Sequence, residues 1–556
     1  MQELISHDPE YRVDFLHPRI LFCHYILLIV FALSSCRATP TPRALASTPA
    51  QPTEPATAMA TFTAQPSAEV AQLRPVGAVR AYPGPEHYAG DILTFEILVT
   101  SDETQTPIPV TLRLDDQEPT EVSAELLFNS MILPLALDTS DLIGSHTVRI
   151  TTTIGNSHIN ELYSFDVLPA SERPAQEANA KWMVNEIDCC VLHYVSGTAA
   201  ARDIGSIAEN FQQAAQDFSA ITGEKFDEHL EVYIIDRIWG NGGFGGDGQL
   251  VISYTDRYYG PTIGAEGLET LARHEFTHAA GVGAFGDGID FNYEGLAVYV
   301  AGGHYKPEPL AQRGAALFDL GYYVPVGQSL EQHELAYLYP AAMLTYIVET
   351  YGADALWKFF AADADTSDGQ PATLEAAIQS TFGISLTEFD ADFRTWLESG
   401  DPGEQLDDLR LTIELQDLRR TYQDTYAPPP YFFLGKAEDI LARTEYLPVV
   451  LREAHAPPNI AIELIIANAQ QAIVDADYPK AEQLIDALKE VLSTQEFENL
   501  LAKEYLAIAI TLTNEGYNLE AIDLQDDQAL VEVTRDSTEL ISLELHRNDA
   551  IWQILQ

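Results

Sequence analysis

The hydrophobic pattern of this 556-residue chain changes along its length, and that change constrains the fold more than any other feature of the sequence. Residues 76–170 alternate short strand-forming runs with turn signals and show no helical period. Residues 171–400 mix strands with amphipathic helices, and residues 431–556 place helical stretches before four short strand-like runs. The pattern therefore predicts a multidomain protein with an N-terminal β domain, a central α+β domain and a C-terminal helical or α+β domain.

The first folded region, 76–170, is predicted to be an immunoglobulin-like β-sandwich. Its candidate strands recur at a spacing of about 10–15 residues, which is typical of such sandwiches. No catalytic motif occurs in this region, so we expect it to be a spacer or a binding domain. The candidate strands are 92–100, 109–114, 124–129, 146–154 and 162–168.

An apolar run at 20–33 lies near the N-terminus and has the length of a signal-peptide core rather than of a membrane-spanning helix. The sequence LSSC follows it and ends at Cys36. It resembles the lipobox of bacterial lipoproteins, in which the cysteine becomes the lipid-modified first residue of the mature protein. The resemblance implies a signal peptide over 1–36, a lipid anchor at Cys36 and a location outside the cytoplasm, on the cell membrane. The alternative is an ordinary signal peptide or an uncleaved membrane anchor.

Residues 37–75 are rich in Pro, Thr and Ala and contain few large apolar side chains. Such a segment buries too little surface to fold, so it is predicted to be a tether. It is nearly neutral, whereas the whole chain carries 30 Lys and Arg against 84 Asp and Glu, a net charge of −54. The folded domains therefore hold the negative charge. That charge argues against a nucleic acid partner and against docking on anionic lipids through basic patches.

The sequence HEFTH begins at His274 and ends at His278, inside the helix-compatible segment 268–281. On a helix, positions i and i+4 share one face, so both imidazoles can reach one cation, with Glu275 beside them. Zinc accepts neutral imidazole nitrogen, and a catalytic zinc site keeps one position for water. The segment therefore predicts a zinc site.

The third ligand decides the subclass of such a site. The third histidine of the longer metzincin motif falls on Ala284, which disfavours that family. Sixteen positions after His278, Glu294 opens the sequence EGLAVY, and a second helix that carries this glutamate can complete a His₂Glu set. HExxH followed by a helix of the pattern EGLAxY resembles the gluzincin zinc metallopeptidases, most closely the peptidase MA-like group. The resemblance covers about 190–400, well under half of the chain.

This resemblance implies a zincin-like fold and zinc ligands His274, His278 and Glu294. It implies that Glu275 is the base that takes a proton from zinc-bound water. Thermolysin-type enzymes place an aspartate four residues after the ligand glutamate, but this chain has Val298 there. The carboxylate that orients a ligand histidine must therefore come from elsewhere.

Gluzincins add a tyrosine or histidine that donates a hydrogen bond to the oxyanion. The helix that follows the ligands in that family resembles 338–352 here, and 386–397 resembles its closing helix. Tyr339 is the first candidate for the donor, with Tyr337 and His333 as alternatives, and a core role is the competing interpretation for each of them.

The central region also contains the sequence GNGGFGG, which formally satisfies a dinucleotide-binding motif. That motif requires a helix after the glycines, whereas the strand-like run 249–254 follows here, so we interpret the glycines as a hairpin. In gluzincins the strand before the active helix pairs with the substrate. The resemblance thus assigns 249–254 as the edge strand and implies an extended peptide substrate.

Cys189 and Cys190 are the cysteines that remain after the signal region. A disulfide between adjacent residues is strained and uncommon, so we expect two buried thiols beside the strand 190–195.

The last third of the chain is predicted to be an accessory domain. Turn-forming residues mark 401–430 as a linker, and 431–556 is predicted to form a small α+β domain with a packing or protein-contact role. Its expected helices are 433–453, 459–475, 478–491 and 495–514.

Together these features predict a membrane-anchored zinc metallopeptidase that hydrolyses peptide or protein substrates outside the cytoplasm. Two alternatives stay open. One is a non-catalytic surface-binding lipoprotein that uses the zincin fold as a platform, and the other is a zinc hydrolase of non-peptide amides.

Overall fold

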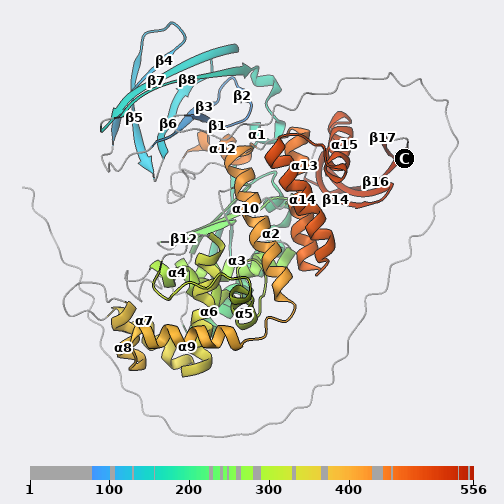
Figure 1. Ribbon diagram of the computed structural model, residues 1–556. Helices are drawn as coiled ribbons and strands as arrows, with labels where there is room; N and C mark the ends of the chain where they lie inside the picture. The colour runs from blue at the N-terminus through green and yellow to red at the C-terminus, as the bar shows by residue number, and fades with distance from the viewer. Residues whose placement is uncertain are drawn as a thin grey trace, which may run out of the picture. The chain divides into compact units, whose positions relative to one another are not determined.

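The protein is described by a computed structural model (Figure 1). The predicted signal peptide, the tether and Cys36 lie outside the described residues. Within the described part of the chain, no helix is both long and apolar enough to cross a bilayer. The described residues are 78–99, 107–127, 130–155, 157–223, 230–237, 242–246, 249–257, 264–279, 290–328, 333–364, 374–428, 443–452, 455–535, 538–548 and 551–555.

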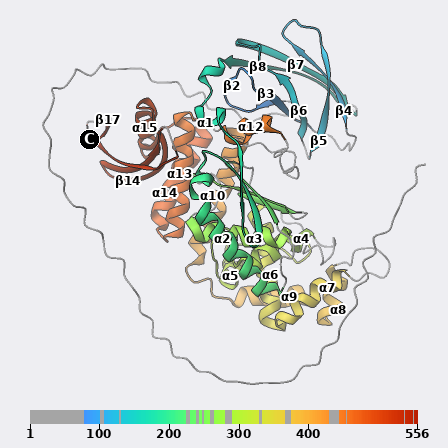
Figure 2. The same ribbon diagram turned by 180° about the vertical axis from the view of Figure 1, so that it is seen from behind.

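The N-terminal domain is one curled sheet of eight strands in the order β1-β3-β6-β5-β4-β7-β8-β2 (Figures 1 and 2). The curl is made at β5, because its first residues pair with β4 and its last residues pair with β6. The inner face holds a core that includes Phe95, Val110 and Ile150. The strands are β1 Val79–Tyr82, β2 His87–Tyr88, β3 Ile92–Leu98, β4 Ile108–Leu114, β5 Thr120–Leu127, β6 Ser130–Asp138, β7 Gly144–Ile154 and β8 Ser157–Leu168.

The immunoglobulin-like sandwich that the sequence predicts is not confirmed. Each predicted strand overlaps an observed one, but β1, β2 and β6 are missing from the prediction. Pro134 lies inside β6 and hides it, because proline in a run normally argues against a strand. Without β6 the link between the two halves of the sheet cannot be seen in the sequence.

The central domain is built on a five-stranded sheet in the order β12-β13-β11-β10-β9. Strands β10, β11 and β13 are parallel, and β9 and β12 run antiparallel to them at the two edges. The glycine-rich segment forms a hairpin as predicted, but the edge strand is β12 and not 249–254, which lies one strand further in. The strands are β9 Trp182–Glu186, β10 Cys190–Val195, β11 Leu230–Ile235, β12 Gly243–Gly246 and β13 Gln249–Ser253.

The longest helix of this domain, α2 Ala199–Thr222, has the amphipathic face that its sequence predicts, with Ile207, Phe211 and Phe218 buried. The Thr198 hydroxyl accepts a hydrogen bond from the Ala201 amide at its start, and Gly223 ends it with a φ of 77°. The other helices follow the sheet in sequence. They are α3 Gly264–Ala279, α4 Asp290–Ala301, α5 Leu310–Asp319, α6 His333–Tyr351, α7 Ala353–Ala364, α8 Leu374–Phe382 and α9 Leu386–Ser399, and the short η1 Ala170–Glu172 and α1 Ala175–Ala178 precede the sheet.

The predicted linker 401–430 is wrong, because it contains the 21-residue helix α10 Gln405–Thr425. Leu409 and Ile413 of α10 belong to the core of the central domain, whereas Leu411 and Leu415 belong to the C-terminal core. Its apolar residues face two different cores and leave only part of the surface polar, with Arg410 and Asp417 exposed, so the sequence lacks the single apolar stripe by which surface helices are recognised. The helix therefore joins the two domains instead of separating them.

The C-terminal domain contains helices followed by a four-stranded antiparallel meander, β14-β15-β16-β17, close to the order that the sequence predicts. Figures 1 and 2 show α13, α14 and α15 beside this sheet. The elements are η4 Thr444–Tyr446, α12 Leu447–Leu451, α13 Pro457–Val474, α14 Tyr478–Thr494, α15 Leu500–Asn514, β14 Asn518–Gln525, β15 Gln528–Thr534, β16 Ile541–Asn548 and β17 Ile551–Ile554.

A buried ion-pair cluster fastens α13 to the central domain. The Glu463 carboxylate, which is 2% exposed, accepts hydrogen bonds of 2.8 and 2.9 Å from Arg237 and one of 2.7 Å from Arg257. The Tyr422 hydroxyl of α10 donates a further bond of 2.8 Å to it. Because a buried charge is tolerated only with partners of this kind, the cluster specifies how these elements dock.

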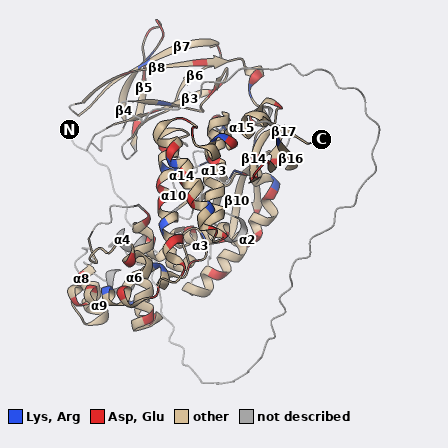
Figure 3. Cartoon of the chain, turned by 45° about the vertical axis from the view of Figure 1, so that its right-hand side comes forward, with Lys and Arg blue, Asp and Glu red and all other residues tan. Residues whose placement is uncertain are grey.

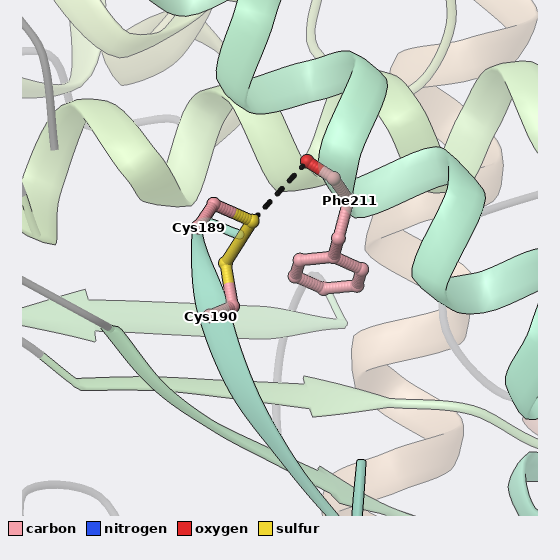
Figure 4. The surroundings of a disulfide bond; sticks show 3 residues. All are labelled: Cys189, Cys190 and Phe211. Carbon is pink, nitrogen blue, oxygen red and sulfur yellow. Dashed lines mark hydrogen bonds between the residues drawn. A yellow bond between two sulfur atoms is a disulfide. The ribbon is translucent and has the colours of Figure 1, made fainter. Parts of the chain in front are cut away.

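Cys189 and Cys190 are buried, as expected, but they are joined in a disulfide, so the prediction of two free thiols is wrong (Figure 4). Residues 187–190 form a tight turn before β10, in which Ile187 and Cys190 exchange both backbone hydrogen bonds. Figure 4 shows the pair facing Phe211 of α2, whose carbonyl oxygen lies 3.8 Å from the Cys189 sulfur. The disulfide is therefore part of the packing between β10 and α2.

Candidate metal centre

Helices α3 and α4 bring the three predicted ligands together. His274 and His278 lie one turn apart on α3, and Glu294 projects from α4. The two histidine Nε2 atoms are 3.1 Å apart, and they lie 3.2 and 3.3 Å from Glu294 Oε2. Among the described residues, these three form the one group of His, Cys, Asp or Glu side chains with the geometry to hold a metal ion.

The dimensions of this group fit zinc. Ligand atoms that bind a tetrahedral zinc at about 2.0–2.1 Å are about 3.3 Å apart, and all three observed separations are close to that value. The donor set of two imidazole nitrogens and one carboxylate oxygen is the set that zinc accepts at catalytic sites. His274 Nδ1 has no hydrogen-bond partner among the described residues, so the carboxylate that would orient this histidine is not identified.

The pKa shifts of His274 and Glu294 suit a bound cation. Burial lowers the pKa of His274 to about 4, so its imidazole is neutral at pH 7 as zinc requires. Burial opposes ionisation of Glu294, but hydrogen bonds from His274 and His278 outweigh it and lower the pKa of this carboxyl. Burial also opposes protonation of His278, yet the hydrogen bond and charge of Glu294 raise its pKa overall. The pocket is thus arranged around one positive charge.

Gly295 explains how Glu294 reaches the histidines. A Cβ atom at Gly295 would lie 2.3 Å from Pro340 Cβ and 2.9 Å from the Pro340 carbonyl carbon. Because these distances are far below van der Waals contact, only glycine lets α4 pack this closely against α6. The Glu-Gly pair of EGLAVY therefore combines a ligand with the close approach that positions it.

The side chain of Glu275 projects from α3 toward the edge strand β12. Its side chain is 3% exposed, and a Cβ atom at Gly243 would lie 2.8 Å from its Oε1 atom. Its Oε2 atom has no hydrogen-bond partner among the described residues. Burial raises the pKa of Glu275 to about 8, so this carboxyl is poised to exchange a proton near neutral pH.

The first candidate for the oxyanion donor, Tyr339, does not face the metal centre. Its hydroxyl donates a hydrogen bond to the Val324 carbonyl, and its ring packs against Phe393 at 5.5 Å. Tyr337 is the tyrosine beside the site, with its ring centroid 6.1 Å from that of His274. Two residues along a helix turn the side chain by about 200°, so the two tyrosines face opposite sides of α6. The side chain of His333, the third candidate, lies outside the described residues.

Three further residues near the site were not predicted. His304 stacks on Tyr337 with centroids 4.1 Å apart, and its ring lies 5.8 Å from that of His274. Its Nδ1 atom lies 3.1 Å from Glu334, which in turn contacts Arg420. No sequence signal pointed to them, because an acidic residue in the first turn of a helix, such as Glu334 in α6, is common and implies no buried partner.

Comparisons with known proteins give structural neighbours and no family assignment. No protein-family model matches the chain, and no curated protein matches it. An M1 zinc metallopeptidase from Deinococcus radiodurans is similar over 56% of this chain and 91% of its own, with 13% identity and a TM-score of 0.28. Yeast LTA4 hydrolase in complex with bestatin is similar over 77% of this chain and 92% of its own, with 10% identity and a TM-score of 0.30. At TM-scores this low the similarities support no conclusion about activity, which has to come from the site.

Proposed function

We propose that the protein is a zinc-dependent hydrolase of peptide bonds. The observation that carries this proposal is the triangle of ligand atoms from His274, His278 and Glu294, with the buried Glu275 carboxyl beside it. Structural zinc sites are closed by a fourth protein ligand, whereas catalytic sites use three and leave a position for water. No fourth candidate ligand joins the group among the described residues.

The residues of the site divide the chemistry among them. Zinc, when bound, supplies Lewis acidity to the carbonyl and lowers the pKa of a water molecule. Glu275 accepts the proton that the attacking water loses and delivers it to the leaving amine. Tyr337 donates a hydrogen bond to the developing oxyanion. Burial and the charge of Glu294 raise the pKa of the Tyr337 phenol, so it keeps the proton that a donor needs.

An extended peptide is the substrate that the sheet favours. Strand β12 pairs with β13 on one side and forms the edge of the described sheet. Its Gly243 lies against Glu275, since a Cβ atom there would be 2.8 Å from Glu275 Oε1. A peptide that pairs with this edge would carry its backbone past the Glu275 carboxyl, with β12 supplying the hydrogen bonds.

The cellular location is part of the proposal. The apolar run 20–33 and the LSSC sequence support an export signal with a lipid anchor at Cys36. The tether 37–75 would then separate the folded domains from the membrane. Radiolabelled palmitate should be incorporated into the full chain in a bacterial host, and Cys36→Ala should abolish the labelling.

The catalytic role of Glu275 is tested by Glu275→Gln in the full chain. We expect the variant to keep one zinc per chain and to lose about 10²- to 10⁴-fold in kcat on a peptide library, because the proton acceptor is gone. Glu269→Gln is the matched control, since Glu269 lies on the same helix and pairs with Arg273 at 3.1 Å.

Two results would contradict the proposal. Unchanged turnover in Glu275→Gln would remove the assigned base. A wild-type protein that holds zinc but cleaves no peptide would favour the non-catalytic binding lipoprotein, or a hydrolase of other amides if a panel of non-peptide amides is cleaved.

A further inference from the structure

We propose that Arg420, Glu334 and His304 are positioning residues that hold Tyr337 over the metal centre, so that helix α10 is a functional part of the active site. The inference rests on the proposed function. It extends that function by assigning a role to a helix that follows the central domain and by naming the residues through which it acts.

The first step is a stack of three rings. His304 lies between Tyr305 and Tyr337, with centroid distances of 4.0 and 4.1 Å and interplanar angles of 30° and 17°. Stacked rings at this separation restrict one another's rotation. The orientation of the Tyr337 ring, and with it the place of its hydroxyl, therefore depends on where His304 is held.

The second step is the carboxylate that holds the stack. Glu334 is fully buried and contacts His304 and Tyr305, the two rings that stack beside Tyr337. Its Oε2 atom lies 3.1 Å from His304 Nδ1, and its Oε1 atom accepts a hydrogen bond of 2.5 Å from the Tyr305 hydroxyl. Fixing two of the three rings by one carboxylate leaves little freedom for the third. The charges of His304 and Arg420 outweigh burial and lower the pKa of Glu334, so the carboxylate is ionised at neutral pH.

The third step leads into α10. Arg420 Nη2 donates a hydrogen bond of 2.6 Å to Glu334 Oε1, and the Arg419 guanidinium lies 5.7 Å from the centre of the Tyr305 ring. An ionised carboxylate with no exposure needs a cationic partner, and removal of that partner leaves an uncompensated buried charge. Arg420 thus fixes Glu334, Glu334 fixes His304, and His304 fixes Tyr337.

Attachment of the C-terminal domain does not explain this arrangement. Glu463 already fastens α13 to the central domain through Arg237 and Arg257. The apolar residues of α10 pack into both cores without the help of Arg420. The charged chain from Arg420 ends instead at a ring beside a metal ligand, which is where a positioning role would place it.

The test compares Arg420→Gln with Arg410→Gln in the full chain. Arg410 is also on α10, but its side chain is 41% exposed and its ion-pair partners among the described residues, Asp407 and Glu482, lie at the surface, so its variant controls for loss of an arginine from this helix. We expect Arg420→Gln to bind one zinc per chain, to lower kcat by about 10- to 100-fold and to leave KM little changed, because a donor used in the transition state is misplaced. Arg410→Gln should match the wild type.

A double-variant cycle asks whether Arg420 acts through Tyr337. If it does, Arg420→Gln should add little to the loss of kcat in Tyr337→Phe, since the donor is already absent. If the fold-losses of kcat in the two single variants multiply in the double variant, the inference is overturned. Retained kcat in a folded Arg420→Gln, or loss of zinc by this variant, would also overturn it. His304→Phe, which keeps an aromatic ring but loses the bond to Glu334, is expected to reproduce the loss of kcat if Arg420→Gln does not fold.

A measurement without turnover separates this inference from the proposed function. With 3-fluorotyrosine at 337, the ¹⁹F resonance of the metal-free protein should shift or broaden in Arg420→Gln and His304→Phe but not in Arg410→Gln. If the ¹⁹F resonance is unchanged in Arg420→Gln and His304→Phe, the positioning role is refuted even if the protein cleaves peptides. A changed resonance in a protein that cleaves no peptide would refute the peptidase proposal and keep the positioning role.

Discussion

At the scale of single residues, the metal centre depends on three side chains whose ligand atoms meet at one point. The ligand atoms of His274, His278 and Glu294 lie within 3.3 Å of one another. His278→Ala removes one of three protein ligands, so zinc affinity should fall by about 100-fold or more. Zinc content after dialysis against a competing chelator measures this. His158→Ala, which alters an exposed histidine in β8, should keep its zinc, and equal zinc in both variants would refute the ligand set.

A pH dependence follows from Glu275 in the metal-free protein. Burial raises the pKa of Glu275 from an ordinary 4.5 to about 8. Glu275 then binds more protons in the folded than in the unfolded state between these values, whereas His274, whose pKa burial lowers from 6.5 to about 4, binds fewer. The two effects offset each other up to about pH 6.5, so stability should fall as pH rises from about 6.5 to 8, by about 2 kcal/mol. Thermal unfolding of the chelated protein should show this fall, and Glu275→Gln should reduce it. A flat profile in the wild type would contradict the burial of this carboxyl.

At the scale of elements, the contact between α4 and α6 sets the position of Glu294. Gly295→Ala places a methyl group 2.3 Å from Pro340 Cβ, so the helices must separate. Overpacking of this kind costs about 1–3 kcal/mol, and we expect weaker zinc binding in the same variant. The matched control is Gly205→Ala in α2, where nothing lies within 4 Å and alanine should stabilise the helix by about 0.5–1 kcal/mol. Equal melting temperatures and zinc affinities for the two variants would show that the close approach is unimportant.

The elements also show why some of the site was predictable from sequence and some was not. The spacing of His274 and His278 is local, and one helical turn brings them together whatever surrounds the helix. The choice between Tyr337 and Tyr339 depends on which face of α6 meets α4, and that is a tertiary property. Arg420 lies 126 residues beyond Glu294, so only the packing of α10 shows that it belongs beside the site. The edge strand was misplaced because β12 is four residues of mostly glycine, with no strand pattern to read.

At the scale of the whole molecule, α10 changes where the catalytic unit ends. The sequence places the end of the central domain at residue 400, but Leu409 and Ile413 lie in its core. A chain that stops at 400 would expose that core and lose the partner of Glu334. We expect such a chain to be insoluble or to unfold without cooperativity, as judged by circular dichroism on heating, whereas the full chain unfolds cooperatively. A stable, zinc-binding fragment ending at 400 would contradict the shared core.

The net charge of −54 is the other property that belongs to the whole molecule. In Figure 3 the Asp and Glu positions are spread over helices of both the central and the C-terminal domains. Their summed field attracts cations toward any cleft, and salt screens it over about 10 Å at 0.1 M. Peptides that carry lysine or arginine should therefore have a higher kcat/KM than neutral peptides of the same length at low salt, mainly through faster association. The difference should shrink at 0.5 M salt. If kcat/KM depends on neither salt nor substrate charge, the acidity serves solubility alone, and a lipid-anchored molecule would gain from it only repulsion from the anionic membrane surface.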